Sequence, residues 1–168
     1  MPLRIEIARS LEELEALRPA LERLPWEREE AEYAYFVTRL RLREEARAPF
    51  AVVVFRDGEP VAGLVARAEE RPLVTAVGYR NLYAPRVRIL QLVDGGIAVF
   101  EPETIDALVG VLRSALAAGE ADAVAVPPLG VSSELFEAFA SLGSPLARQR
   151  FLAPWAINAH HEGGPLAF

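Results

Sequence analysis

The chain has 168 residues, 52% of them hydrophobic, and a net charge of −6; its 18 basic residues are all arginine. A chain of this length buries the core of one domain, and an acidic balance argues against a nucleic-acid interface, which needs a basic face. The absence of cysteine excludes disulfides and thiolate metal sites, and the absence of lysine excludes Schiff-base chemistry. No apolar run approaches the roughly 20 residues of a membrane-spanning helix, so we expect a cytoplasmic protein without membrane contact.

The N-terminal part predicts one strand and two helices. Leu3 to Ala8 alternates between apolar and polar residues, as in a strand. Ser10 then begins a capping box with Glu13, and leucines follow at helical spacing. Pro19 should kink or split this helix.

The second helix is expected over Glu27 to Arg47. Its core-facing residues should be Ala31, Ala34, Tyr35, Thr38 and Leu42. Its arginines, Arg39, Arg41, Arg43 and Arg47, alternate with acids, which is typical of a solvated helix face, and a contact for an anionic ligand or partner is the alternative.

The middle of the chain predicts a β-hairpin over Phe50 to Arg67. An Asp57-Gly58 turn joins two arms that are apolar at nearly every position. Arms of this kind are buried on both faces, so the hairpin should be the spine of the sheet.

The second half alternates between strands and helices. The expected elements are a strand over Pro72 to Gly78, an irregular segment Tyr79 to Arg86, a strand from Val87 to Val93 ended by Asp94-Gly95-Gly96, a helix from Glu101 to Gly119, a strand from Ala121 to Val126, a helix from Ser132 or Ser133 to Leu142, and a strand from Phe151 to Ile157. This order predicts an α/β fold with a mixed, mostly antiparallel, twisted sheet and helices on both faces. One domain should span residues 1–158, with 159–168 as a tail or the start of a missing continuation.

The element order resembles the GNAT acyltransferase fold. The most specific piece is ADAVAVPPLGVSSELFEAFASLG, which is similar to the strand, loop and short helix of the GNAT pattern. The segments SLEELEALRPALERLPW and FRDGEPVAGLVAR, with the span from Leu90 to Gly119, narrow the resemblance to the N-terminal unit of cellulose-biosynthesis-type tandem-GNAT proteins.

The resemblance implies an N-acyltransferase that uses acetyl-CoA or another acyl-CoA as cosubstrate, with direct attack of an amine on the thioester. GNAT enzymes hold the coenzyme A pyrophosphate on backbone N–H groups between strand four and the next helix. The corresponding segment here is DGGIAVFEPET, where Gly95 and Gly96 are the candidate donors. Glu101 and Glu103 would repel a pyrophosphate, which favours a degenerate site over a working one. In the tandem relatives the acyl-CoA site is assigned to the C-terminal unit, which this chain lacks.

The resemblance also places Tyr79, Tyr83, Arg80 and Arg86 at the edge of the acceptor cleft. A tyrosine there would protonate the departing thiolate, and the arginines would bind an anionic group of the substrate. Ordinary loop packing is the alternative interpretation.

The remaining candidates favour structural roles. His160-His161 are expected to be tail residues rather than a metal site, and Ser132-Ser133 helix caps rather than nucleophiles. The rival to an enzyme is a non-enzymatic interaction module. It would dock a second GNAT unit, or a like subunit in a homodimer, through the hairpin edge or the apolar C-terminal segment.

Overall fold

The computed structural model describes residues 2–42, 46–72, 75–77, 80–127 and 134–140. They fall into two parts, one ending at Pro127 and one that contains helix α4 (Glu134–Ala140), and each part is described by itself. The predicted caps of α4, the strand Phe151 to Ile157 and the two histidines lie outside the described residues. So do residues 141–158, and one domain over residues 1–158 therefore stays a prediction.

A five-stranded mixed sheet forms the centre of the first part. Its strand order is β1-β2-β3-β6-β7, and each neighbouring pair is antiparallel except β6 and β7, which are parallel. The bounds are β1 Arg4–Ala8, β2 Ala46–Arg56, β3 Glu59–Pro72, β6 Arg86–Val99 and β7 Ala123–Ala125. This confirms the predicted mixed, mostly antiparallel sheet.

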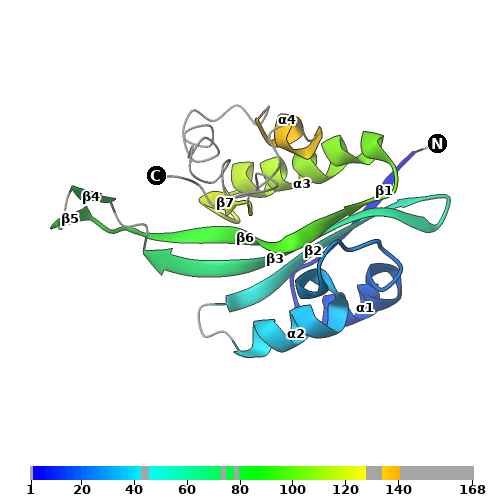
Figure 1. The fold of residues 1–168 in the computed structure, drawn as a ribbon, viewed down its shortest axis with the longest axis horizontal. Coiled ribbons are helices and arrows are strands. Elements are labelled where there is room, and N and C mark those ends of the chain that lie inside the picture. The colour runs from blue at the N-terminus through cyan, green and yellow to red at the C-terminus, as the bar shows by residue number, and fades with distance from the viewer. Residues whose placement is uncertain (1, 43–45, 73–74, 78–79, 128–133, 141–168) are drawn as a thin grey trace, which may run out of the picture. The chain divides into compact units, whose positions relative to one another are not determined.

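Helices cover both faces of this sheet (Figure 1). One face carries α1 (Leu11–Leu21), the 3-10 turn η1 (Glu29–Ala31) and α2 (Tyr33–Leu42), and the other carries η2 (Pro102–Thr104) and α3 (Ile105–Ala117). The layers meet through buried leucine, valine and phenylalanine side chains; the largest are Phe36, Leu14, Leu21, Leu64, Leu92, Leu108 and Leu112. None of the described helices is both long enough and apolar enough to cross a membrane.

The β2–β3 hairpin is confirmed as the spine. Asp57 and Gly58 both have positive φ, 54° and 87°, as the tight turn requires. Residues 51–55 of β2 pair with β1 on one side and with β3 on the other, and β3 pairs with β6. Residues 51–55 of the hairpin therefore have a strand on each side, whereas the β2 residues before Ala51 pair, among the described strands, only with β3, and docking of a partner at the hairpin edge stays a prediction.

Helix α1 begins as predicted. The Glu13 backbone N–H donates to Ser10 Oγ at 3.1 Å, and the Ser10 N–H donates to Glu13 Oε2 at 3.2 Å. Pro19 does not split the helix, which continues to Leu21. Since the helix ends two residues later, the missing proline N–H affects only its last turn.

The second predicted helix is wrong in both its extent and its face. The chain makes η1 and then α2, and residue 46 already belongs to β2. Of the predicted face only Ala31, in η1, is buried, whereas Tyr35 and Leu42 are 38% and 73% exposed. The buried side chains of α2 are Phe36, Val37 and Leu40.

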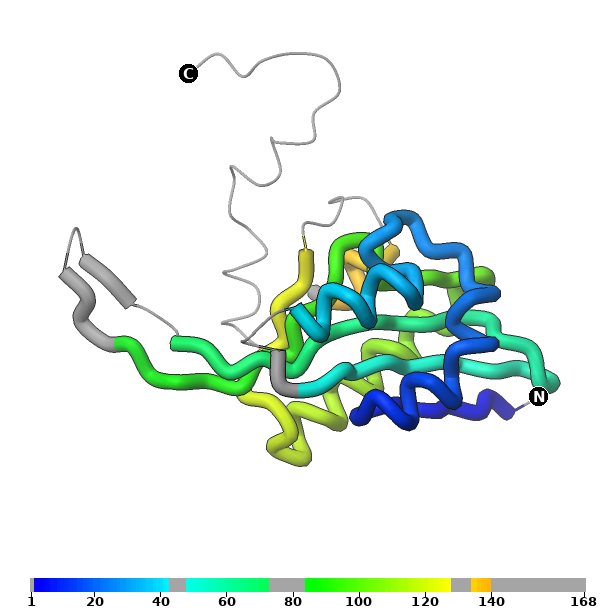
Figure 2. The backbone as a smooth tube through the Cα atoms, turned by 90° about the horizontal axis from the view of Figure 1, so that it is seen from below, coloured from blue at the N-terminus to red at the C-terminus, as the bar shows by residue number. Residues whose placement is uncertain are grey.

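Strands β3 and β6 extend beyond the helices as a two-stranded ribbon (Figure 2). Strands β4 (Thr75–Val77) and β5 (Arg80–Tyr83) form a separate two-stranded sheet at its end (Figure 1). The segment predicted to be irregular thus contains β5, and the strand predicted over Pro72 to Gly78 is reduced to β4. The strand predicted to end at Val93 continues to Val99.

Helix α3 follows the prediction. Ile105, Leu108, Val109, Leu112 and Ala115 are buried on one face. Gly119, with a φ of 70°, lies just beyond the helix end and stops it.

Candidate functional site

The two glycines predicted to bind the cofactor lie inside β6, at a bulge. On β3, Leu64 pairs with Ile97 and Ala66 with Leu92, so Val65 alone faces the β6 residues 93–96. A Cβ on Gly96 would lie 2.7 Å from the Val93 carbonyl oxygen and 2.8 Å from that of Val65. Glycine is needed here because two strands approach closely, and Gly96 is not part of a loop after the strand as we had expected.

Gly95 is covered by the segment between α1 and η1. Its φ is 65°, and a Cβ there would lie 2.4 Å from Arg28 Cγ and 2.8 Å from the Arg28 backbone nitrogen. The guanidinium of Arg28 also forms a loose ion pair with Asp94, at 3.7 Å. Packing against Arg28 therefore accounts for Gly95 without a cofactor.

The start of α3 is acidic and already neutralised in part by the protein itself. Arg56, at the end of β2, forms ion pairs with Glu101 Oε2 at 2.5 Å and with Glu103 Oε1 at 3.2 Å. One arginine offsets only one of these carboxylates, and Asp106 adds another in the first turn. The helix start therefore keeps a net negative charge.

The backbone donors of this turn are also occupied. Pro102 has no N–H, and the Glu103 carboxylate accepts from its own backbone N–H, which lowers its pKa first of all, with Arg56 as the next cause. The Thr104 N–H donates to the Glu101 carbonyl at 2.9 Å, and the Ile105 N–H donates to the Pro102 carbonyl. Residues 102, 104 and 105 thus leave no backbone donor to cradle a phosphate.

The predicted acceptor-cleft residues do not join this site. Arg80 and Tyr83 lie on β5, whose small sheet is at the far end of the β3–β6 ribbon, away from the start of α3 (Figure 1). Arg86 begins β6, and its guanidinium lies 3.4 Å from Glu70 Oε1. Tyr79 lies outside the described residues.

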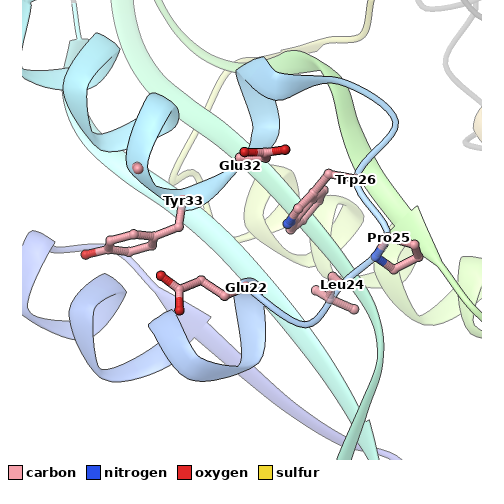
Figure 3. A pocket seen from close by; sticks show the side chains of 7 residues that line it. Glu22, Leu24, Pro25, Trp26, Glu32 and Tyr33 are labelled. Carbon is pink, nitrogen blue, oxygen red and sulfur yellow. The ribbon is translucent and has the colours of Figure 1, made fainter.

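A hollow of about 390 Å³ lies between the end of α1 and the start of α2 (Figure 3). Its lining consists of Glu22, Leu24, Pro25, Trp26, Glu32, Tyr33 and Ala34. Glu22 is paired with Arg18 at 2.7 Å, and the Trp26 indole N–H donates to the Leu21 carbonyl at 2.7 Å. A lining with two carboxylates and no basic side chain does not suit a polyphosphate such as coenzyme A.

A second hollow, of about 380 Å³, lies where β3, β6 and the end of α3 meet. Its charged lining residues are Glu69, Glu70, Arg88 and Glu120. Arg88 is held by Asp122 and Glu120 by Arg9, each pair through two guanidinium nitrogens. This lining is also acidic overall, and its one cation is already paired.

Sequence reasoning found the acidic helix start but missed Arg56 and Arg28. Arg56 contacts Glu103 and Arg28 contacts Gly95, and in both cases the two residues are far apart in the sequence. No local pattern connects them. A metal site is not formed either: within the described ranges no group of three or more His, Asp or Glu side chains is placed to hold an ion.

No protein-family model matches the chain, and no curated protein matches it in sequence. Several solved structures match its fold. An aminoglycoside acetyltransferase from an uncultured soil metagenomic sample is 19% identical with a TM-score of 0.51, covering 85% of this chain and 91% of that one. A probable acetyltransferase is 19% identical with a TM-score of 0.48, over 84% of this chain and 89% of the other.

A ribosomal-protein-alanine N-acetyltransferase from Brucella melitensis biovar Abortus 2308 is 15% identical with a TM-score of 0.46, over 85% and 92% of the two chains. The narrower resemblance to tandem proteins of the cellulose-biosynthesis type stays a prediction. The soil acetyltransferase, with its TM-score above 0.5, supplies the fold comparison. The chain therefore has the fold of the GNAT acetyltransferases.

Proposed function

We propose that this chain is a GNAT-fold domain, related to the acyl-CoA-dependent N-acyltransferases, whose own coenzyme A site is degenerate. The observation that carries the proposal is the start of α3. There, Glu101 and Glu103 with their partner Arg56 occupy the place where the GNAT pattern puts a pyrophosphate.

The electrostatic energies at the start of α3 favour exclusion of the cofactor. A helix N-terminus contributes about 0.3–1 kcal/mol toward a bound anion. A like charge near 4 Å costs roughly 1 kcal/mol in water and about 4 kcal/mol near a protein surface. With two of the three carboxylates left unbalanced and the first backbone donors used internally, repulsion exceeds the attraction of the helix end.

The bulge supports the same conclusion. The backbone of Arg28 packs against Gly95, so the turn before η1 covers the segment predicted to donate to the cofactor. An acyltransferase function of this fold would thus depend on a second unit that supplies the acyl-CoA site.

Isothermal titration with acetyl-CoA and free coenzyme A tests this proposal. We expect no saturable binding by the wild type at millimolar ligand, with a GNAT acetyltransferase as the positive control in the same buffer. The variant Glu101→Gln/Glu103→Gln should gain weak binding because it leaves Arg56 unpaired at a helix start. Adding Arg56→Gln should abolish that gain.

Saturable micromolar binding by the wild type would overturn the proposal and make amine acceptors the next substrates to screen. If none of the variants binds, the degenerate site stands but the carboxylates are not its cause.

A non-enzymatic interaction module is the second candidate function. The observation that favours it is the outer edge of β1, which pairs with no other described strand besides β2.

A further inference from the structure

Strand β1 is the border of the five-stranded sheet. Each of its residues, Arg4 to Ala8, pairs with one residue of β2, from Phe55 back to Ala51. Within the described part of the chain, no other strand pairs with it. A border strand presents a row of backbone donors and acceptors to any strand that can lie beside it.

We infer that two copies of this chain associate edge to edge through antiparallel β1 strands, with a twofold axis at Ile5. The inference concerns assembly and holds whether or not the chain binds coenzyme A. It joins the two sheets into one continuous sheet across the dimer.

The side chains of β1 are complementary to their own copy in this arrangement. A twofold axis at Ile5 places Arg4 opposite Glu6 of the second copy, and Glu6 opposite its Arg4. Leu3 then lies opposite Ile7 of the second copy, and Ile5 opposite Ile5. Apolar residues meet on one face and opposite charges on the other, and pairs of both kinds stabilise antiparallel strands.

The faces follow from the pairing with β2. Arg4 and Glu6 lie opposite Phe55 and Val53, whose side chains belong to the core beneath α1 and α2. Ile5 lies opposite Val54 and therefore points to the other face. A twofold axis perpendicular to the sheet puts the same face of both copies on the same side of the joined sheet. Each residue of β1 can therefore pair only with a residue of the second copy whose side chain points to that same side.

The neighbouring registers are excluded by charge. An axis at Arg4 would place that arginine opposite its own copy, and an axis at Glu6 would do the same with the two glutamates. Like charges directly opposite each other destabilise a strand pair. The order Leu-Arg-Ile-Glu-Ile therefore permits one central register and penalises the adjacent ones.

The residues that would meet are available at the surface. Ile5 is 40% exposed, and the side chains of Arg4 and Glu6 are 58% and 38% exposed. Arg4 and Glu6 already form an ion pair within the chain, and the Arg4 guanidinium lies 4.2 Å from the centroid of the Phe55 ring. This ordering reduces the side-chain entropy that a pair across the dimer would otherwise lose.

A second copy fits the edge better than an unrelated peptide. Charged side chains usually protect border strands from pairing because they repel a partner of the same charge. Here one positive and one negative residue flank an isoleucine, so an antiparallel second copy brings opposite charges together and is not repelled. Pro2, which lacks an N–H, lies opposite Ala8 of the second copy, and the ladder ends there.

Charge reversal with recombination tests the interface, using sedimentation velocity on the full chain from micromolar to submillimolar concentrations. The wild type should form a concentration-dependent dimer. Arg4→Glu alone makes each charged cross-strand pair a pair of glutamates, and Glu6→Arg alone makes it a pair of arginines. Each single variant should therefore dimerise about tenfold more weakly or not at all. An equimolar mixture of the two single variants should dimerise again, because every cross-strand pair is then of opposite charge.

Two further variants keep the test decisive if a single reversal reduces folding. The double variant Arg4→Glu/Glu6→Arg restores both kinds of pair and should dimerise like the wild type. Ile5→Lys, which puts two ammonium groups at the axis, should be monomeric. Circular dichroism checks that each variant is folded.

A wild type that stays monomeric at every concentration would overturn the inference. So would a dimer that survives both single reversals and Ile5→Lys, since its interface must then lie elsewhere. A mixture of single variants that fails to dimerise would contradict the register centred on Ile5.

Discussion

Arg88 and Asp122 bind each other through both main chain and side chain. The Arg88 backbone N–H donates to Asp122 Oδ2 at 2.8 Å, and its Nη2 donates to Oδ1 at 2.7 Å. In return, the Asp122 N–H donates to the Arg88 carbonyl at 2.8 Å. Arg88 Nη1 also donates to the Gly119 carbonyl at 2.6 Å. One arginine of β6 thereby fixes the turn that joins α3 to β7.

The variant Asp122→Asn should lower the melting temperature by about 2–4 °C, because the amide cannot accept from both guanidinium nitrogens. It should also change the pH dependence of stability. Arg88 lowers the pKa of Asp122 below its ordinary value of 3.8. The unfolded chain therefore takes up this proton at a higher pH than the folded chain. The stabilisation that the Arg88–Asp122 pair contributes is present above about pH 4 and is lost as the pH falls through the lowered pKa of Asp122.

Urea denaturation between neutral pH and pH 3 measures this difference. The free energy of unfolding should fall more steeply below about pH 4 in the wild type than in Asp122→Asn. Glu27→Gln, at an exposed carboxylate with no ion pair among the described residues, is the matched control and should follow the wild type. Equal slopes for wild type and Asp122→Asn would show that the pair does not contribute.

Gly95→Ala should destabilise the protein more than Gly119→Ala. Both glycines have left-handed φ angles, 65° and 70°, so each substitution costs roughly 1 kcal/mol in backbone strain. At Gly119 a Cβ meets nothing within 4 Å, but at Gly95 it meets the side chain and backbone of Arg28. We expect an additional cost of about 1–3 kcal/mol at Gly95.

The measurement is the free energy of unfolding of both variants in urea. A third variant, Gly95→Ala with Arg28→Ala, removes the contact with Arg28 Cγ but keeps those with its Cβ and backbone nitrogen, so it should recover only part of the loss. Equal costs at the two glycines would mean that Arg28 does not pack on the bulge.

Gly110→Ala should instead stabilise the protein, by about 0.5–1 kcal/mol. Gly110 lies within α3, and a Cβ there meets nothing within 4 Å. Alanine reduces the entropy of the unfolded chain without a clash in the helix. A rise in melting temperature on differential scanning calorimetry checks this, and a fall would mean that the helix is packed more closely at Gly110 than the structure describes.

Local rules predicted the parts of this fold that local chemistry determines. The Asp57-Gly58 turn, the capping box of Ser10 and the stop at Gly119 each depend on residues within a few positions, and each is confirmed. The same rule, that glycines mark a turn, predicted that the strand ends at Gly95-Gly96, but β6 continues through both residues. Those glycines are required by Arg28 and Val65, which approach from distant parts of the chain.

The candidate site was predictable only in its charge. Glu101 and Glu103 stand out in the sequence because they precede an amphipathic helix. Their partner Arg56 ends β2 and lies near them because the start of β3, which follows Arg56 in the hairpin, pairs with the end of β6 just before Glu101. Arg80 and Tyr83 lie on the β4–β5 sheet, away from this site, and no local signal in the sequence distinguishes such a strand from a loop.

Helix α2 was assigned the wrong face because its sequence carries two stripes at helical spacing. The predicted stripe contains Tyr35 and Thr38, which suit the surface: the Arg39 guanidinium lies 5.8 Å from the Tyr35 ring centroid, and the Thr38 hydroxyl donates to the Ala34 carbonyl at 2.8 Å. The other stripe contains Phe36 and Leu40, which have no polar atoms and bury more area.

This difference gives a direct test of α2. Phe36 is 1% exposed, so Phe36→Ala should cost about 3–5 kcal/mol by removing a buried ring and leaving a cavity. Leu42 on the same helix is 73% exposed, and Leu42→Ala should change the free energy of unfolding by less than about 0.5 kcal/mol. Chemical denaturation of the two variants decides between the faces, because the stripe predicted from the sequence requires the reverse order of costs.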